Sequence, residues 1–231
     1  MYYMEELTLT QEYFICAINE DGSISALNGW GIAVCLIVSE VMELTALGCV
    51  VCDEKHRLLG VKKPEEESLP YLQQMYNTLM HYKEPTDMAI VARSYSSRLG
   101  WGENYPKMQN NLLSPIGGPL AERGFVSVQP RKGLFHNKTD YIPKPEAVMR
   151  VTKKIRAAFL GNGEITGDVL CLLALLEKSN MLRKHFNKME TEALKRRLLE
   201  LRESEAFASI RDILAYVDYV DRIVSTLDWG G

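Results

Sequence analysis

The chain uses one local pattern twice: an apolar helical stretch that stops at a glycine and is followed at once by two short strands around a charged turn. The first copy covers residues 44–61 and the second covers residues 120–135. A glycine that ends a helix adopts the left-handed conformation that closes the last carbonyls, and Gly48 and Gly124 occupy this place. Short β-branched or aromatic runs on either side of a turn pair as a hairpin. Because the other segments show helical spacing, we predict a mainly α fold, a single helical domain over residues 1–231 with two short β-hairpins.

Several helices follow from spacing and start signals. Thr8 and Gln11 match a capping box and predict a helix that begins at Leu9. Residues 31–47 are apolar around nearly the whole circumference, which is typical of a helix at the centre of a core. Further helices are expected after the acidic run 64–68, after Pro85, and over Val148–Phe159, Val169–Leu176, Glu192–Leu201 and Ile210–Val224.

Residues 100–119 are rich in glycine, asparagine and proline. Such composition favours irregular structure, so we expect a long loop with at most two helical turns. Long loops carry binding residues more often than the elements they connect. This stretch is therefore the best candidate for a functional surface.

The charge of the chain is unevenly distributed. The whole chain of 231 residues is 46% apolar, ample for a core, and carries a net charge of −3, so it is not a polycation of the kind that binds nucleic acid. Residues 130–200, however, hold 15 lysines and arginines against 8 acidic residues. This excess either faces anionic lipid or phosphate, or belongs to solvated helix faces.

The sequence predicts a cytoplasmic protein. Residues 1–6 lack a basic segment followed by an apolar stretch and a small-residue cleavage site, which a secretory signal requires. The longest apolar run, 30–38, is well short of the roughly 20 residues that span a bilayer, so any membrane contact is expected to be peripheral. The five cysteines lie in apolar contexts and are expected to be free thiols of a reducing compartment.

No motif predicts catalysis. Cys49 and Cys52 form one pair without the second pair of a closed zinc site. The four histidines are far apart in the sequence, and no serine or cysteine lies in a nucleophile elbow. We therefore expect neither an enzyme, a cofactor nor a metal site.

Two groups of residues are candidates for binding. Gly117 and Gly118 precede Pro119, so helix-terminal amides there would be open to an anion, unless the segment is simply a tight turn into a short helix. Trp30 is either a core anchor or an interfacial aromatic. The second group flanks the polar tip of the second hairpin and suits shallow insertion into a headgroup layer, unless it is a small core cluster. This group is Leu134, Phe135, Lys138, Tyr141 and Ile142.

Five segments carry a family likeness. They are Leu7–Glu12, Asp21–Gly22, Glu43–Gly48, Leu120–Val126 and Leu172–Leu176. In this order and spacing the chain resembles the Golgi phosphoprotein 3 family over nearly its full length. The resemblance implies a mostly helical single domain with short hairpins. In eukaryotic members it implies a cytosolic peripheral membrane protein that binds phosphatidylinositol 4-phosphate and the tails of membrane enzymes.

The resemblance also implies a lipid pocket built from a tryptophan and arginines. In an ungapped register these positions fall on Asn28, Ile37, Asn110 and Leu113, so the pocket residues are not retained. Amide and alkyl groups lack the charge-assisted donors that a phosphomonoester needs. The nearest substitutes for the pocket are Trp30, Lys107 and Arg123, beside Gly117 and Gly118.

Our leading hypothesis is a non-enzymatic peripheral membrane or adaptor protein. Its basic C-terminal half and the tip of the second hairpin would face an anionic membrane, with a phosphoinositide as the lipid that the resemblance implies. One alternative is a protein-interaction module that has lost lipid binding. A further alternative is a nucleic-acid binder of winged-helix type, although neither hairpin turn is strongly basic.

Overall fold

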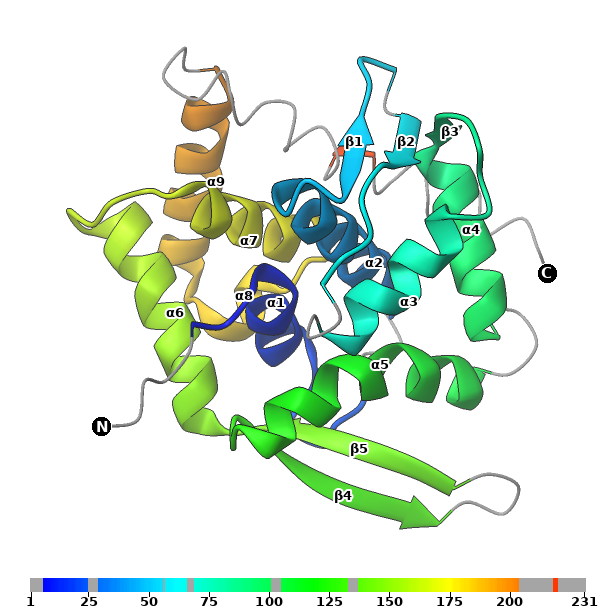
Figure 1. Cartoon of the computed structure of the whole chain (residues 1–231). Helices are drawn as coiled ribbons and strands as arrows, with labels where there is room; N and C mark the ends of the chain where they lie inside the picture. Colours follow the sequence, from blue (N-terminus) through cyan, green and yellow to red (C-terminus); the bar gives the residue numbers. More distant parts are fainter. Residues whose placement is uncertain are drawn as a thin grey trace.

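The computed structural model describes residues 6–24, 29–55, 57–65, 69–100, 105–132, 137–203 and 218–219, with the backbone alone at 105–109, 132, 137 and 138. Over these residues the fold is mainly helical and carries two small antiparallel sheets (Figure 1). The predicted fold class is confirmed.

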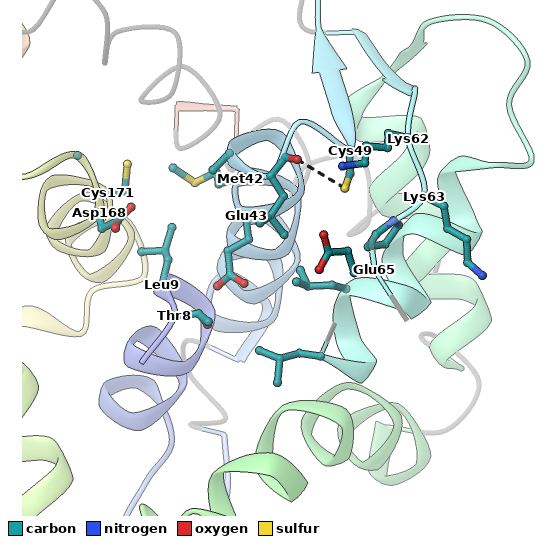
Figure 2. A pocket seen from close by; sticks show the side chains of 16 residues that line it. Thr8, Leu9, Met42, Glu43, Cys49, Lys62, Lys63, Glu65, Asp168 and Cys171 are labelled. Atoms are coloured by element: carbon teal, nitrogen blue, oxygen red, sulfur yellow. Dashed lines mark hydrogen bonds between the residues drawn. The ribbon is translucent and has the colours of Figure 1, made fainter. Parts of the chain in front are cut away.

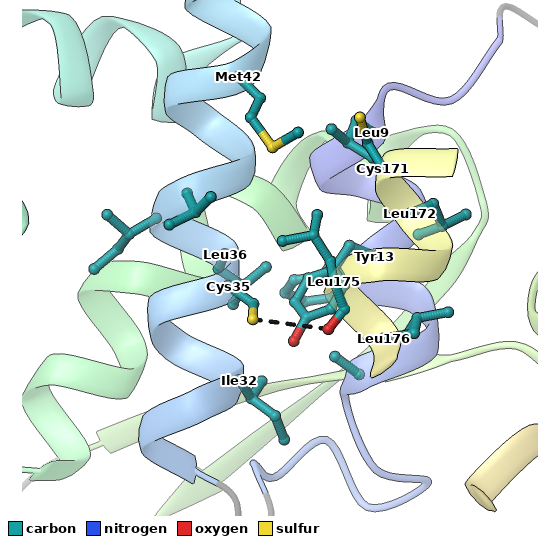
Figure 3. Close-up of a cluster of buried hydrophobic side chains, with 14 of the residues drawn as sticks. Leu9, Tyr13, Ile32, Cys35, Leu36, Met42, Cys171, Leu172, Leu175 and Leu176 are labelled. Carbon is teal, nitrogen blue, oxygen red and sulfur yellow. Dashed lines mark hydrogen bonds between the residues drawn. The ribbon is translucent and has the colours of Figure 1, made fainter. Parts of the chain in front are cut away.

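Three helices form the centre of the core. In α1 (Leu9–Ala17), all nine residues are buried, and the helix begins with the predicted capping box at Thr8. It packs against α2 (Gly29–Ala46) and α7 (Gly167–Lys178). Figure 3 shows side chains of α1 and α7 directed toward α2, where the Cys35 thiol donates to the Leu175 carbonyl oxygen at 3.7 Å. The sequence correctly assigned the most apolar helix to the interior.

Among the described residues, α2 is the one helix long and apolar enough to cross a bilayer by length and composition. Its window is 72% buried inside the protein, and Leu36 and Ile37 have exposed fractions of 0% and 1%. These apolar side chains pack against α1, α3 and α7. The length and composition of α2 are therefore explained by its place in the core.

The first hairpin consists of β1 (Val50–Cys52) and β2 (Arg57–Gly60), as predicted. A third strand that the sequence did not indicate, β3 (Thr86–Asp87), pairs with β2. The helices beside this sheet begin later than expected: α3 spans Pro70–Leu79 and α4 spans Met88–Leu99. The acidic run 64–65 and Pro85 therefore precede these helices, and the Asp87 carboxylate caps α4 by accepting from the Ala89 amide.

The prediction of a long loop over residues 100–119 was wrong, because α5 spans Tyr105–Glu122. Pro115 and Pro119 lie inside this helix, where each removes one backbone donor. The helix forms because Leu112, Ile116 and Leu120 recur at helical spacing and are at most 1% exposed. Packing of this apolar face outweighs the helix-breaking tendency of its prolines and glycines.

The second hairpin consists of β4 (Val126–Lys132) and β5 (Asn137–Pro143). A hairpin was predicted here, but within residues 120–135, and the returning strand lies beyond that range because Arg131 and Lys132 belong to β4 and not to the turn. It is followed by α6 (Pro145–Leu160), and by α8 (Leu182–His185) and α9 (Lys188–Glu203) after α7. In Figure 1 the second hairpin lies below α5, far from the first hairpin. The predicted helix over Ile210–Val224 lies outside the described residues, apart from 218–219.

Candidate functional site

The second hairpin is the most exposed element with a concentration of basic residues. Residues 127–131 of β4 are all exposed, and Val128 has 51% of its surface accessible. The strand register places Arg131 opposite Lys138 and Lys132 opposite Asn137. Because paired residues lie side by side, the register brings the backbone positions of three basic residues together at the end of the two strands. The hairpin therefore carries its positive charge at its distal end.

An ion pair fixes one of these basic residues. The Arg131 Nε lies 2.8 Å from the Asp140 Oδ2 across the hairpin. The Asp140 side chain is fully buried, whereas 56% of the Arg131 side chain is exposed. A buried carboxylate needs a partner, so Arg131 has a structural role besides its charge.

The base of the second hairpin packs on α5. A Cβ on Gly117 would lie only 2.4–2.8 Å from atoms of the Tyr141 ring, so the missing side chain provides the space for this ring. Tyr141 is 9% exposed and Ile142 is half-buried. Tyr141 is thus a core residue and not a membrane contact, which corrects the first interpretation. Leu134 and Phe135 lie outside the described residues, and Lys138 is described by its backbone alone.

The proposed anion site at Gly117 and Gly118 was also wrong. Both glycines lie in the last third of α5, a long way from the N-terminus of that helix. Anions bind the free amides of a first helical turn, which residues inside a helix do not provide. Gly117 serves packing, and at Gly118 an added Cβ would meet open space.

The other candidate residues, Trp30, Lys107 and Arg123, lie on different parts of the fold. Arg123 donates to Gln11 Oε1 at 2.9 Å, and its guanidinium lies 5.0 Å from the centroid of the Phe125 ring. It thereby joins the end of α5 to the start of α1. Trp30 lies in the first turn of α2 with 36% exposure, and Lys107 lies near the start of α5, with only its backbone described.

Comparison with known proteins agrees with this architecture. The model of the Golgi phosphoprotein 3 (GPP34) family matches residues 9–217. The chain belongs to this family. A search of curated proteins finds no match to the sequence.

In this Golgi phosphoprotein 3 family protein, several basic residues of the C-terminal half have acidic partners within the fold. Arg156 binds Glu190 at 2.8 Å between α6 and α9, and Lys195 binds Glu177 at 2.9 Å between α9 and α7. Further ion pairs are Lys154–Glu12, Arg196–Glu200 and Arg197–Glu200. Of these acids, only Glu12 lies outside residues 130–200, so the segment keeps most of its net positive charge, while the paired cations themselves are partly engaged.

One of these ion pairs has a buried acid. Glu12 is 6% exposed, and its two carboxylate oxygens accept from the Lys154 ammonium at 2.8 and 2.9 Å. Burial raises the pKa of Glu12, while the hydrogen bonds and charge of Lys154 lower it. The pair joins α1 to α6 at the edge of the hydrophobic core.

Within the described part of the chain, no group of three or more histidine, cysteine, aspartate or glutamate residues is arranged to hold a metal ion. The thiols of Cys49 and Cys52 instead donate to the neighbouring carbonyl oxygens of Leu47 and Asp53, at 3.9 and 3.6 Å. The five cysteines are free.

Proposed function

We propose that this protein is a non-enzymatic, cytosolic peripheral membrane protein that docks on anionic lipid through the distal end of its second hairpin. The observation that carries the proposal is the register of β4 and β5, which gathers Arg131, Lys132 and Lys138 beside the tip 133–136. Basic residues at a membrane surface each contribute about 1 kcal/mol of attraction to anionic lipids. Leu134 and Phe135, which lie between the two strands in the sequence, are residue types suited to the headgroup boundary.

The proposal selects the hairpin over the helices because of the internal ion pairs. Five basic residues of α6 and α9 are already paired with Glu12, Glu177, Glu190 or Glu200: Lys154, Arg156, Lys195, Arg196 and Arg197. A cation that has an acidic neighbour must be separated from it, or shared with it, to attract a phosphate. The second hairpin has one such pair, Arg131–Asp140, among its described residues.

We also propose that the protein recognises the negative charge of a lipid and not one specific headgroup. The positions that align with the family's arginines include Ile37 and Leu113, which are 1% and 2% exposed. Buried aliphatic side chains supply no donor to a phosphomonoester. We therefore infer that phosphatidylinositol 4-phosphate binds as one anionic lipid among others.

Vesicle flotation tests this function. We expect the protein to float with vesicles of phosphatidylcholine and phosphatidylserine at about 50 mM salt, and much less at about 1 M, where charges are screened over about 3 Å. Vesicles that carry phosphatidylinositol 4-phosphate at the same total charge should bind equally well. Equal flotation with neutral and anionic vesicles at low salt would contradict the proposal. Tighter binding to phosphatidylinositol 4-phosphate at matched charge would contradict the inference about specificity.

A further inference from the structure

A cavity of about 650 Å³ lies at the end of α2 that is opposite Trp30. It is lined by the first residues of α1, the last turns of α2 and the first turns of α7 (Figure 2). The rest of the lining comes from the start of β1, residues 62–65, and Leu69 and Leu72 at the start of α3. Pockets for small molecules typically measure about 300–1,000 Å³. The cavity therefore has the size of a ligand site.

The walls of this cavity are mainly apolar. Leu9 and Met42 face it from α1 and α2, and Leu47, Leu69 and Leu72 continue the apolar surface. Leu47 is 55% exposed, although it is a large apolar side chain. Burial of such surface by an apolar ligand is favourable in proportion to the area removed from water. Most of the ligand should thus be apolar.

Inside the cavity lies the carboxyl group of Glu43. Its Oε1 accepts from the Thr10 amide at 2.6 Å, and its Oε2 accepts from the Tyr71 hydroxyl at 2.9 Å. The Tyr71 and Thr8 hydroxyl oxygens are 2.8 Å apart. Figure 2 shows the Glu43 side chain extending from α2 toward Thr8, while Lys63 extends away from Glu43. The carboxyl group is held in one position by α1 and α3.

The Glu43 carboxyl group is a hydrogen-bond acceptor on the cavity wall. The Thr10 amide and the Tyr71 hydroxyl each donate to one of its oxygens, and a carboxylate has about four lone-pair sites. Burial raises the pKa of Glu43, and the donors from Thr10, Thr8 and Tyr71 lower it. A ligand that enters the cavity gains most if it brings a hydrogen-bond donor to this group.

We propose that this cavity binds a small apolar molecule that carries one hydrogen-bond donor, such as a medium-chain alcohol, with the donor on Glu43 and the chain along Leu9 and Met42. The site is independent of membrane docking, because none of the residues that line it belongs to the second hairpin. In Figure 1 the second hairpin and the end of α2 that leads to β1 lie on opposite sides of the molecule. Vesicle flotation therefore reports on one proposal and ligand binding on the other.

The first test uses the unmodified protein and two isomeric competitors. The fluorescent probe is 1-aminoanthracene, an apolar ring system with one amine, and its emission should rise saturably at one site per chain. The competitors are 1-heptanol, which has a donor, and hexyl methyl ether, which has the same atoms and no donor. We expect 1-heptanol to displace the probe at about tenfold lower concentration, the ratio that one good hydrogen bond supplies. Absence of saturable binding, or equal displacement by the two isomers, would overturn the proposal.

The second test uses variants with a matched control. Ala46→Trp adds a large ring at an exposed position of the cavity wall and should weaken probe binding at least about tenfold. Ala157→Trp makes the same change at an exposed position of α6 and should leave it unchanged. Glu43→Gln should abolish the preference for 1-heptanol. Thermal unfolding verifies that each variant folds, and full probe affinity in a folded Ala46→Trp protein would refute the site.

Discussion

At the scale of single residues, the structure assigns packing roles to side chains that sequence patterns associate with binding. Gly117 makes room for the Tyr141 ring, and Arg123 holds the start of α1 through Gln11. Lys184, in the basic segment of the chain, donates to the carbonyl oxygens of Cys16, Ala17 and Ile18 at 3.2, 3.4 and 2.6 Å. Each role depends on a neighbour that lies far away in the sequence.

Gly117→Ala is expected to lower the free energy of unfolding by about 1–3 kcal/mol, because the new Cβ would overlap the Tyr141 ring and force it to move. Gly31→Ala is the control: it also replaces a helical glycine, but its Cβ would meet only ordinary contacts, so stability should rise by about 0.5–1 kcal/mol. Urea denaturation measures both changes. Equal stability of the two variants would show that Tyr141 does not pack as described.

Lys184→Met is expected to cost about 1–3 kcal/mol of stability, because the carbonyl oxygens at the end of α1 lose the ammonium that donates to them while the length of the side chain is kept. Lys153→Met, at an exposed position of α6, should change stability by less than about 0.5 kcal/mol. Urea denaturation of both variants distinguishes the two positions. A neutral Lys184→Met would mean that water replaces the ammonium without loss.

His185 predicts a pH dependence. Its Nε2 lies 2.7 Å from the Cys16 carbonyl oxygen, and burial lowers its pKa below the ordinary value of 6.5. Since the unfolded chain then binds the proton more readily, this contribution to stability is present above pH 6.5 and is lost as the pH falls below it. The raised pKa values of Glu12, Glu40 and Glu43 act in the opposite direction. A comparison of the unmodified protein with a His185 variant therefore isolates the contribution of this histidine to the pH dependence of stability.

Unfolding free energies of the unmodified protein and of His185→Gln should be compared at pH 7.5 and 5.5. We expect the unmodified protein to lose more stability on acidification than the variant does. An identical pH dependence of the two proteins would show that the His185 pKa is the same in the folded and unfolded chain.

At the scale of elements, agreement with the sequence depends on whether the signal is local. The capping box of α1 and the first hairpin were predicted correctly, because their spacing and glycines act within a few residues. The second hairpin was predicted in the right region, but its returning strand was placed too early. By contrast, α5 was not predicted, because the helix-breaking tendency of Pro115 and Pro119 was given more weight than the apolar helical spacing of this segment. That spacing is formed by Leu112, Ile116 and Leu120. The register that places Arg131 opposite Lys138 was not predicted, because the expected hairpin ended at residue 135. The ion pairs Arg156–Glu190 and Lys154–Glu12 depend on tertiary contacts that no local pattern contains.

The start of α1 offers a test at this scale. Thr8 accepts from the Gln11 amide, and its hydroxyl is also joined to Tyr71. Thr8→Ala should lower stability by about 1 kcal/mol, as is usual for loss of an N-cap, whereas Thr8→Ser keeps the hydroxyl and should cost much less. Thermal unfolding measures both. Equal losses in the two variants would assign the effect to the methyl group of Thr8 and not to its hydrogen bonds.

At the scale of the whole molecule, the fold separates two functions. The core of α1, α2 and α7 supports the second hairpin through α5 at one side and encloses the cavity at the other. Several cations of α6 and α9 have acidic partners, whereas the hairpin end gathers basic residues at neighbouring strand positions, so we assign the anionic surface to the hairpin end. Docking by the hairpin is the claim on which the proposed function depends.

The most direct test of this claim is flotation of the double variant Lys132→Gln/Lys138→Gln on vesicles of phosphatidylcholine and phosphatidylserine at low salt. Arg131 is kept because it pairs with the buried Asp140. The control Arg183→Gln/Lys188→Gln removes the same charge from exposed positions of α8 and α9. We predict about 30-fold weaker binding of the hairpin variant, from about 1 kcal/mol per basic residue, and little change in the control. Equal binding of the two variants would contradict docking through the second hairpin.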